Sequence, residues 1–152
     1  MGAVTEQATP YERFGGHEFF DTLVKRFYEG VATDEPLRAL YPEEDLGPAE
    51  DRLRMFLEQY FGGPHTYSET RGHPRLRMRH APYAVTLDQR DRWLRHMLGA
   101  LDTMHLPAED DVVIRSYLVN AADFMVNVAE EMPVRSNGPT LGLTDVRANP
   151  AL

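Results

Sequence analysis

The chain contains no cysteine, and this absence removes several classes of protein from consideration. Disulfide scaffolds and thiolate metal sites are both excluded, because each needs cysteine sulfur. The sequence also lacks an apolar run long enough to span a membrane, and its start lacks the basic and apolar stretches of a signal peptide. We therefore expect a cytoplasmic protein with no membrane partner.

Positive charge is scarce relative to negative charge, with 16 Lys and Arg residues against 24 Asp and Glu residues. A chain with a formal net charge of −8 repels nucleic acids, so no nucleic-acid partner is expected. The length of 152 residues suits one domain. Because both ends hold few large apolar residues, we expect a flexible arm at 1–10, a folded domain at 11–132 and a disordered tail at 133–152.

Apolar residues recur at three- and four-residue steps, a spacing that predicts helices. The clearest runs lie at 19–31, 49–60, 93–101 and 113–128. Thr86 and Gln89 have the spacing of a capping box and predict the start of the third of these helices. The segment 64–85 has no sustained period and is punctuated by proline and glycine. The pattern predicts an all-α protein of five or six helices with one long irregular segment.

The irregular segment is rich in histidine and arginine, and its residues alone leave four interpretations open. It contains His65, His73 and His80 and four arginines against a single glutamate. A solvated basic loop is the ordinary explanation. A phosphate-binding loop conflicts with the net charge, and the histidine spacing matches no standard zinc pattern. In the fourth interpretation one histidine binds haem iron and nearby arginines pair with the haem propionates.

Three aromatic residues with polar hydrogens, Tyr28, Tyr41 and Trp93, lie among the apolar helix faces. Taken singly, each is more often an ordinary core aromatic. A haem pocket needs a mostly apolar slot, a strong axial nitrogen and a few hydrogen-bond donors opposite that nitrogen. The three aromatic residues suit the last of these requirements.

Longer blocks of the sequence resemble group II truncated haemoglobins. These blocks are residues 41–46, 52–60, 62–64, 72–82 and 90–94, and the resemblance covers about residues 11–131. It implies an all-α truncated globin, a two-over-two helical sandwich around haem b (iron protoporphyrin IX). In that family an extended loop replaces most of the proximal helix, and the segment 64–85 stands where this loop is expected.

The resemblance also implies roles for individual residues. His80 is the expected proximal iron ligand, and Ala49 stands where many globins have a distal histidine. The expected donors on the distal, catalytic side are Tyr28, Tyr41 and Trp93. Leu53 is expected to face the gas, and the residues expected to line the porphyrin are Phe56, Leu57, Leu76 and Met97. The expected propionate partners are Arg52, Tyr67 and Arg79.

The implied function is the binding of dioxygen and other small diatomic ligands at a polar distal site. Polar donors slow the release of dioxygen and thereby favour redox chemistry, such as nitric oxide detoxification or peroxidase-like turnover. Oxygen storage, delivery or sensing without turnover is the alternative. The expected partners are dioxygen, nitric oxide, carbon monoxide or peroxide, together with an unidentified reductase. Whether the chain also forms a homodimer stays open at this stage.

Overall fold

The computed structural model describes residues 8–72 and 85–126, and within them the chain forms helices and no strand. The fold class predicted from the sequence is therefore confirmed. In chain order the helices are α1 (Pro10–Phe14), α2 (Gly16–Thr33), α3 (Glu35–Arg38), α4 (Gly47–Tyr60), α5 (Thr66–Arg71), α7 (Leu87–Asp102) and α8 (Ala108–Met125).

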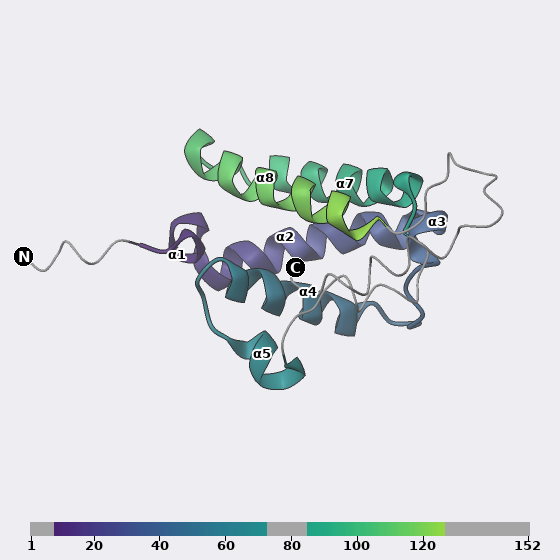
Figure 1. The fold of residues 1–152 in the computed structure, drawn as a ribbon, viewed down its shortest axis with the longest axis horizontal. Helices are drawn as coiled ribbons and strands as arrows, with labels where there is room; N and C mark the ends of the chain where they lie inside the picture. The colour runs from purple at the N-terminus through teal and green to yellow at the C-terminus, as the bar shows by residue number, and fades with distance from the viewer. Residues whose placement is uncertain (1–7, 73–84, 127–152) are drawn as a thin grey trace, which may run out of the picture.

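The four longest helices form two layers. α2 packs against both α4 and α7, and α7 packs against α8. In Figure 1 the pair α7 and α8 lies above the pair α2 and α4, while the short α5 hangs below α4. This arrangement is the two-over-two sandwich that the resemblance implied.

The core is built around α2, which lies between α4 and α7. The helix buries residues along most of its length, namely Phe19, Phe20, Leu23, Val24, Phe27, Tyr28 and Val31. Their spacing is the one that predicted a helix at 19–31, and burial on two sides explains why the apolar surface of α2 is wide. Burying a large apolar side chain such as Phe20 contributes about 1.5–3 kcal/mol to stability.

The folded part begins earlier than the sequence suggested. Thr9 Oγ1 accepts a hydrogen bond from the Glu12 N–H at 3.1 Å, and Glu12 Oε1 accepts one from the Thr9 N–H at 3.2 Å. This reciprocal pair is a capping box that starts α1. The Tyr11 N–H also donates to the Phe61 carbonyl at 2.8 Å, which fixes α1 to the end of α4. Helix α1 therefore starts within the predicted arm 1–10, whereas the predicted tail 133–152 lies outside the described residues.

The segment 64–85 is less irregular than its sequence indicated, because α5 lies within it. Gln59 accepts from the Ser68 N–H at 2.9 Å and donates to Ser68 Oγ at 2.8 Å. Tyr67 is buried, and its ring meets Phe56 edge-on with centroids 5.6 Å apart. A six-residue helix is unstable alone, so these tertiary contacts supply the stability that the local pattern lacks.

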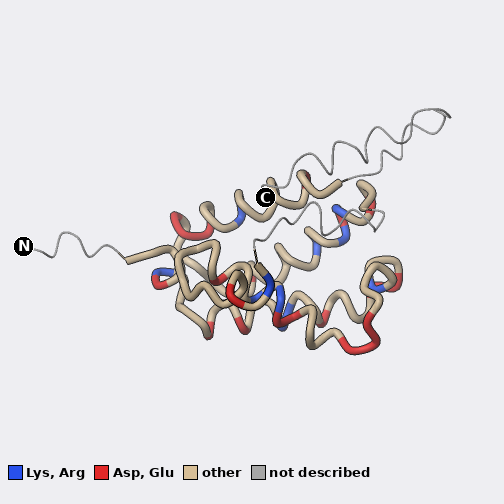
Figure 2. The backbone as a smooth tube through the Cα atoms, turned by 60° about the horizontal axis from the view of Figure 1, so that its bottom comes forward, with Lys and Arg blue, Asp and Glu red and all other residues tan. Residues whose placement is uncertain are grey.

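Acidic and basic residues are interspersed along the chain, as the coloured positions on the backbone in Figure 2 show. Many of these charges are paired, such as Arg115 with Asp102 and Asp111. Exposed pairs contribute only about 0–1 kcal/mol each, so the core carries most of the stability. In the stretches 8–72 and 85–126, every helix is too short or too polar to cross a bilayer.

Candidate functional site

A cavity of about 450 Å³ lies between the two helical layers. Side chains of α2, α4, α7 and α8 line it, together with residues of α3, of α5 and of the loop after α3. The apolar part of the lining includes Leu37, Leu40, Ala49, Leu53, Phe56, Leu57, Val85, Leu118, Ala121, Ala122 and Met125. A mostly apolar slot of this size with a few polar groups is typical of a site for a small organic molecule or cofactor.

Eight of the residues that the sequence proposed for the site line this cavity: Tyr28, Tyr41, Arg52, Leu53, Phe56, Leu57, Tyr67 and Trp93. Met97 is not among the lining residues, and its side chain is fully buried in the core cluster. The porphyrin contact expected for Met97 therefore has no support in the described cavity. His80, Leu76 and Arg79 lie outside the described residues.

The three expected donors lie together in the cavity wall. The Tyr28 hydroxyl and the Trp93 indole N–H both approach the Tyr41 hydroxyl closely enough to affect its pKa. An indole N–H can only donate, so Trp93 is the donor in any hydrogen bond with Tyr41. The rings also pack closely, with the Tyr28 and Tyr41 centroids 5.6 Å apart and edge-on. The cluster thus joins α2, α7 and the loop after α3.

The pKa values of the two tyrosines show that both phenols are neutral. Burial raises the pKa of Tyr28 well above its usual value, and the neighbouring Tyr41 raises it further. Burial also raises the pKa of Tyr41, while the neighbouring Tyr28 and Trp93 lower it. Both hydroxyls therefore keep their hydrogens at physiological pH, and each can donate one hydrogen bond.

The cluster brings three polar hydrogens to one wall of the cavity. Each phenol carries one O–H donor, and the Trp93 indole carries one N–H donor. The Tyr41 hydroxyl lies at the centre of the group, because the polar ends of Tyr28 and Trp93 both approach it. The cluster is suited to holding a polar ligand in an otherwise apolar pocket.

Three arginines line the same cavity, and of these three the sequence analysis proposed only Arg52 as a partner for the cofactor. Arg52 Nη1 lies 3.1 Å from Glu43 Oε2, with both side chains about one-third exposed. The Arg71 guanidinium lies over the Tyr67 ring, 5.8 Å from its centroid. Arg90 also lines the cavity and pairs with acidic neighbours. Guanidinium groups beside an apolar slot suit a cofactor that carries carboxylates.

Two further polar residues of the lining, Tyr117 and Gln89, were not proposed from the sequence. The Tyr117 hydroxyl and Gln89 Oε1 are buried, and neither has a hydrogen-bond partner among the residues that the structure describes. Tyr117 lies within the run at 113–128 that predicts a helix, and only its polar tip distinguishes it from the apolar residues around it. An unsatisfied buried polar group costs about 1–3 kcal/mol, so these two atoms suit a site whose occupant supplies partners.

These residues fit haem. The apolar lining suits the porphyrin faces, the arginines suit its carboxylates, and the unpartnered polar atoms suit its edge or its ligand. Within 8–72 and 85–126, no group of three or more His, Asp or Glu side chains could hold a bare metal ion. A helical sandwich enclosing such a pocket defines a globin-type cofactor protein.

The chain belongs to the bacterial-like globin family, which matches residues 9–127, and within it to the group II truncated haemoglobins. It is 40% identical to the group 2 truncated haemoglobin YjbI of Bacillus subtilis (strain 168) over 121 residues, covering 80% of this chain and 90% of that protein. Haem b is accordingly its cofactor, and as a globin it binds dioxygen.

Solved structures show the same relationship. A thermostable haemoglobin from Thermobifida fusca is 62% identical, with a TM-score of 0.79 over 80% of this chain and 98% of that one. A truncated oxygen-avid haemoglobin from Bacillus subtilis is 39% identical, with a TM-score of 0.74 over 79% of this chain and 100% of that one. The two-over-two fold is therefore shared across the family at widely different identities.

Proposed function

We propose that this protein retains dioxygen in a polar pocket and uses it in redox chemistry, with the oxidation of nitric oxide as the leading reaction. Haem b, when bound, supplies an iron centre that takes a diatomic gas and exchanges single electrons. The observation that carries the proposal is the cluster of Tyr28, Trp93 and Tyr41 in the wall of an apolar cavity. Fixed donors in a low-dielectric site stabilise a polar ligand strongly, which favours retention over rapid delivery.

Tyr41 is the residue that we expect to contact the ligand directly. Its hydroxyl is the one that both Tyr28 and Trp93 approach, and its hydrogen is available to a ligand in the cavity. Leu53 also lines the cavity and, in this proposal, faces the gas beside Ala49. The oxygen-avid character stated for the Bacillus subtilis relative agrees with a pocket that retains dioxygen.

The residues that hold the cofactor follow partly from the resemblance and partly from the cavity. Phe56 and Leu57 are proposed to pack on the porphyrin with Leu76, and Arg52, Tyr67 and Arg79 to contact its carboxylates. Because they line the same cavity, Arg71 and Arg90 join the candidates for those carboxylates. Repeated turnover requires an electron donor, so we also propose a reductase partner in the cytoplasm.

His80 is proposed as the axial ligand. The variant His80→Gly should lose most of its haem or regain the ferrous spectrum when imidazole is added. The variants His65→Ala and His73→Ala should keep that spectrum, since neither side chain is assigned to the iron. Loss of axial ligation in either of these two variants but not in His80→Gly shows the assignment to be wrong.

The redox role is tested by rapid mixing of the dioxygen-loaded ferrous protein with nitric oxide. We expect one equivalent of nitrate per haem, formed faster than dioxygen leaves the protein. A suitable control is Tyr11→Phe, since the Tyr11 ring stacks on Phe20 in the core, 5.7 Å between centroids, and is not part of the lining described above. If dioxygen is released without reacting and no nitrate forms, the redox proposal is wrong and the protein stores or delivers dioxygen.

A further inference from the structure

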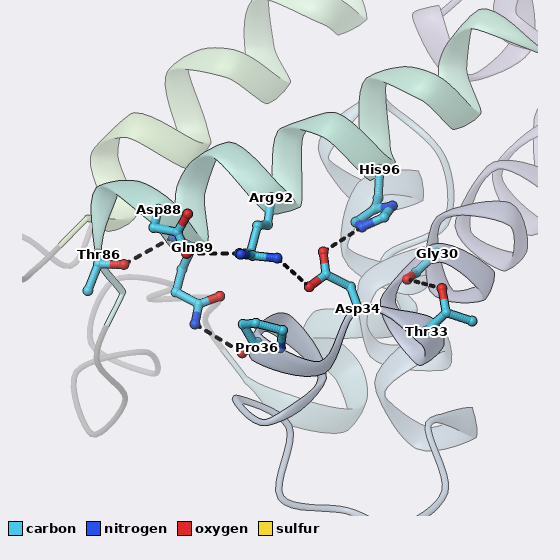
Figure 3. A network of polar contacts seen from close by, with 9 residues as sticks. All are labelled: Gly30, Thr33, Asp34, Pro36, Thr86, Asp88, Gln89, Arg92 and His96. Atoms are coloured by element: carbon cyan, nitrogen blue, oxygen red, sulfur yellow. Dashed lines mark hydrogen bonds and ion pairs between the residues drawn. The ribbon is translucent and has the colours of Figure 1, made fainter.

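Asp34 lies at the junction of α2 and α3, where it follows the last residue of one helix and precedes the first residue of the other. Its side chain is only 7% exposed. Both carboxylate oxygens bind residues of α7: Oδ1 accepts from Arg92 Nη1 at 2.8 Å, and Oδ2 lies 2.8 Å from His96 Nε2 (Figure 3). One nearly buried carboxylate therefore ties the α2–α3 junction to α7.

Several features show that this tie is specific. The hydrogen bonds from His96 and Arg92 hold the pKa of Asp34 below its usual range, so the carboxylate is ionised at neutral pH. Gly30 leaves room for the imidazole, since a Cβ atom at Gly30 would lie 2.3 Å from His96 Nδ1. Gln89 Nε2 adds a second link between α7 and α3 by donating to the Pro36 carbonyl at 3.0 Å.

Arg38 extends the connection from α3 to the loop that carries Tyr41. It is the last residue of α3, and its Nη1 donates to the Tyr41 carbonyl at 3.0 Å. Its Nη2 donates to the carbonyls of Glu43 and Glu44, both at 2.8 Å. Helix α3 is thus held to α7 at its start by Asp34 and holds the Tyr41 loop at its end.

The elements that meet at Asp34 are the elements that carry the donor cluster. Trp93 follows Arg92 directly on α7 and lies one turn before His96. Tyr28 lies on α2, whose last turn leads into Asp34. Hydrogen bonds weaken steeply with distance and misalignment. The bonds that Trp93 and Tyr41 can form with each other or with a shared ligand therefore depend on how α7 sits against α3 and its loop.

We propose that Asp34 is a positioning residue for the ligand site. By holding α3 against α7, it keeps the Trp93 and Tyr41 side chains in the relative position that hydrogen bonding requires. It thereby sets how strongly the pocket retains dioxygen relative to carbon monoxide. Asp34 is absent from the lining of the described cavity, so it acts through the two helices and not by touching the ligand. The effect on gas retention rests on the proposed function, in which the donors face the ligand.

Trp93 is the only tryptophan of the chain, so its indole N–H gives a single signal in nitrogen-15 NMR. We expect Asp34→Asn, in the haem-loaded carbon monoxide form of the full chain, to shift or broaden that signal. The matched control is Asp88→Asn, because the Asp88 carboxylate binds Arg92 Nε at 2.8 Å but is 56% exposed and lies within α7 itself. The control should leave the signal unchanged. If the indole signal of Asp34→Asn is the same as that of Asp88→Asn, the proposal is overturned.

The variant His96→Ala provides a second test, because it removes one of the two bonds and leaves Asp34 paired with Arg92. It should move the indole signal in the same direction as Asp34→Asn. Should Asp34→Asn fail to fold, this variant decides the question, and an unmoved signal counts against the proposal.

A double-mutant comparison separates positioning from general destabilisation. Asp34→Asn should speed dioxygen release by about three- to tenfold, and carbon monoxide release by less, as expected for the weakening of one hydrogen bond. In a Trp93→Phe/Tyr41→Phe background the same substitution should add little. If Asp34→Asn speeds dioxygen release by the same factor in both backgrounds, the positioning role is overturned. If the background variant releases both gases as the wild type does, the proposed function fails, while the indole signal still decides the role of Asp34.

Discussion

Replacing Tyr41 by phenylalanine removes the oxygen atom at which the three donors meet. The ring packing against Tyr28 is retained, since only the hydroxyl is lost. Two effects follow. The pocket loses the donor that we expect to contact dioxygen, and the Tyr28 O–H and the Trp93 N–H both lose the hydroxyl oxygen that they approach.

The size of each effect follows from the energies of hydrogen bonds. A bond to a partly charged ligand contributes about 1–2 kcal/mol, so dioxygen release should accelerate about five- to thirtyfold. Carbon monoxide is nearly apolar, and its release should change by less than about twofold. Donors left buried without an acceptor cost about 1–3 kcal/mol, so the free energy of unfolding should fall by about that amount. If the freed Trp93 turns to the ligand, the kinetic effect lies at the lower end.

Stopped-flow measurement of both release rates tests this reasoning. The dioxygen form is mixed with excess carbon monoxide, and the carbon monoxide form with excess nitric oxide. Tyr11→Phe controls for the loss of a tyrosine hydroxyl away from the cavity, and we expect wild-type rates from it. A Tyr41→Phe protein in which the two gases accelerate by the same factor refutes the idea of a directed donor, because that result is expected of a general opening of the pocket.

Four further substitutions test other parts of the structure. Tyr117→Phe removes a buried hydroxyl that has no partner in the described part of the chain. The free energy of unfolding of the haem-free protein, measured in urea, should therefore rise by up to about 1–3 kcal/mol. Haem transfer from this variant to a competing globin should become faster. Gly30→Ala should destabilise the protein in thermal melts because of the clash with His96, whereas Gly99→Ala, with no atom within 4 Å of the added Cβ, should stabilise helix α7 by about 0.5–1 kcal/mol; the opposite order contradicts the packing described. The depressed pKa of Asp34 stabilises the fold above its unfolded pKa of about 3.9, and this contribution is lost as the pH falls through the lower folded pKa. Below about pH 4, the free energy of unfolding should therefore fall less for Asp34→Asn than for the wild type, as measured by chemical unfolding at several pH values. The same pH dependence in both proteins argues against the pKa shift.

Features that depend on local sequence were predictable. The period of apolar residues at 19–31 predicted α2, and Thr86 does accept the bond from the Gln89 N–H at 3.0 Å that its spacing suggested. A helical face and a cap are each determined within a few residues, so neighbouring sequence is sufficient to recognise them.

Features that depend on contacts between distant residues were missed. Helix α5 exists because Gln59 and Phe56 of α4 hold Ser68 and Tyr67, which no local period records. Spacing on a helix likewise does not show which buried residue meets a cavity: Leu57 and Met97 are both buried in the core cluster, and only Leu57 is among the lining residues of the described cavity.

The polar connections across the site belong to the same class. Asp34 and His96 are 62 residues apart, and Trp93 and Tyr41 belong to two elements that meet only in the fold. The resemblance supplied the donor residues, while their grouping around the Tyr41 hydroxyl came from the structure.

The central claim is that a directed hydrogen-bond donor meets the ligand in this pocket. The infrared stretching band of carbon monoxide held in the ferrous protein measures this most directly, because a donor near the oxygen end weakens the C–O bond and lowers the band. We predict a band at lower frequency in the wild type than in Tyr41→Phe, with Trp93→Phe between the two and Tyr11→Phe unchanged. A band at the same position in all four proteins would contradict the claim, since the ligand would then feel no donor from this cluster.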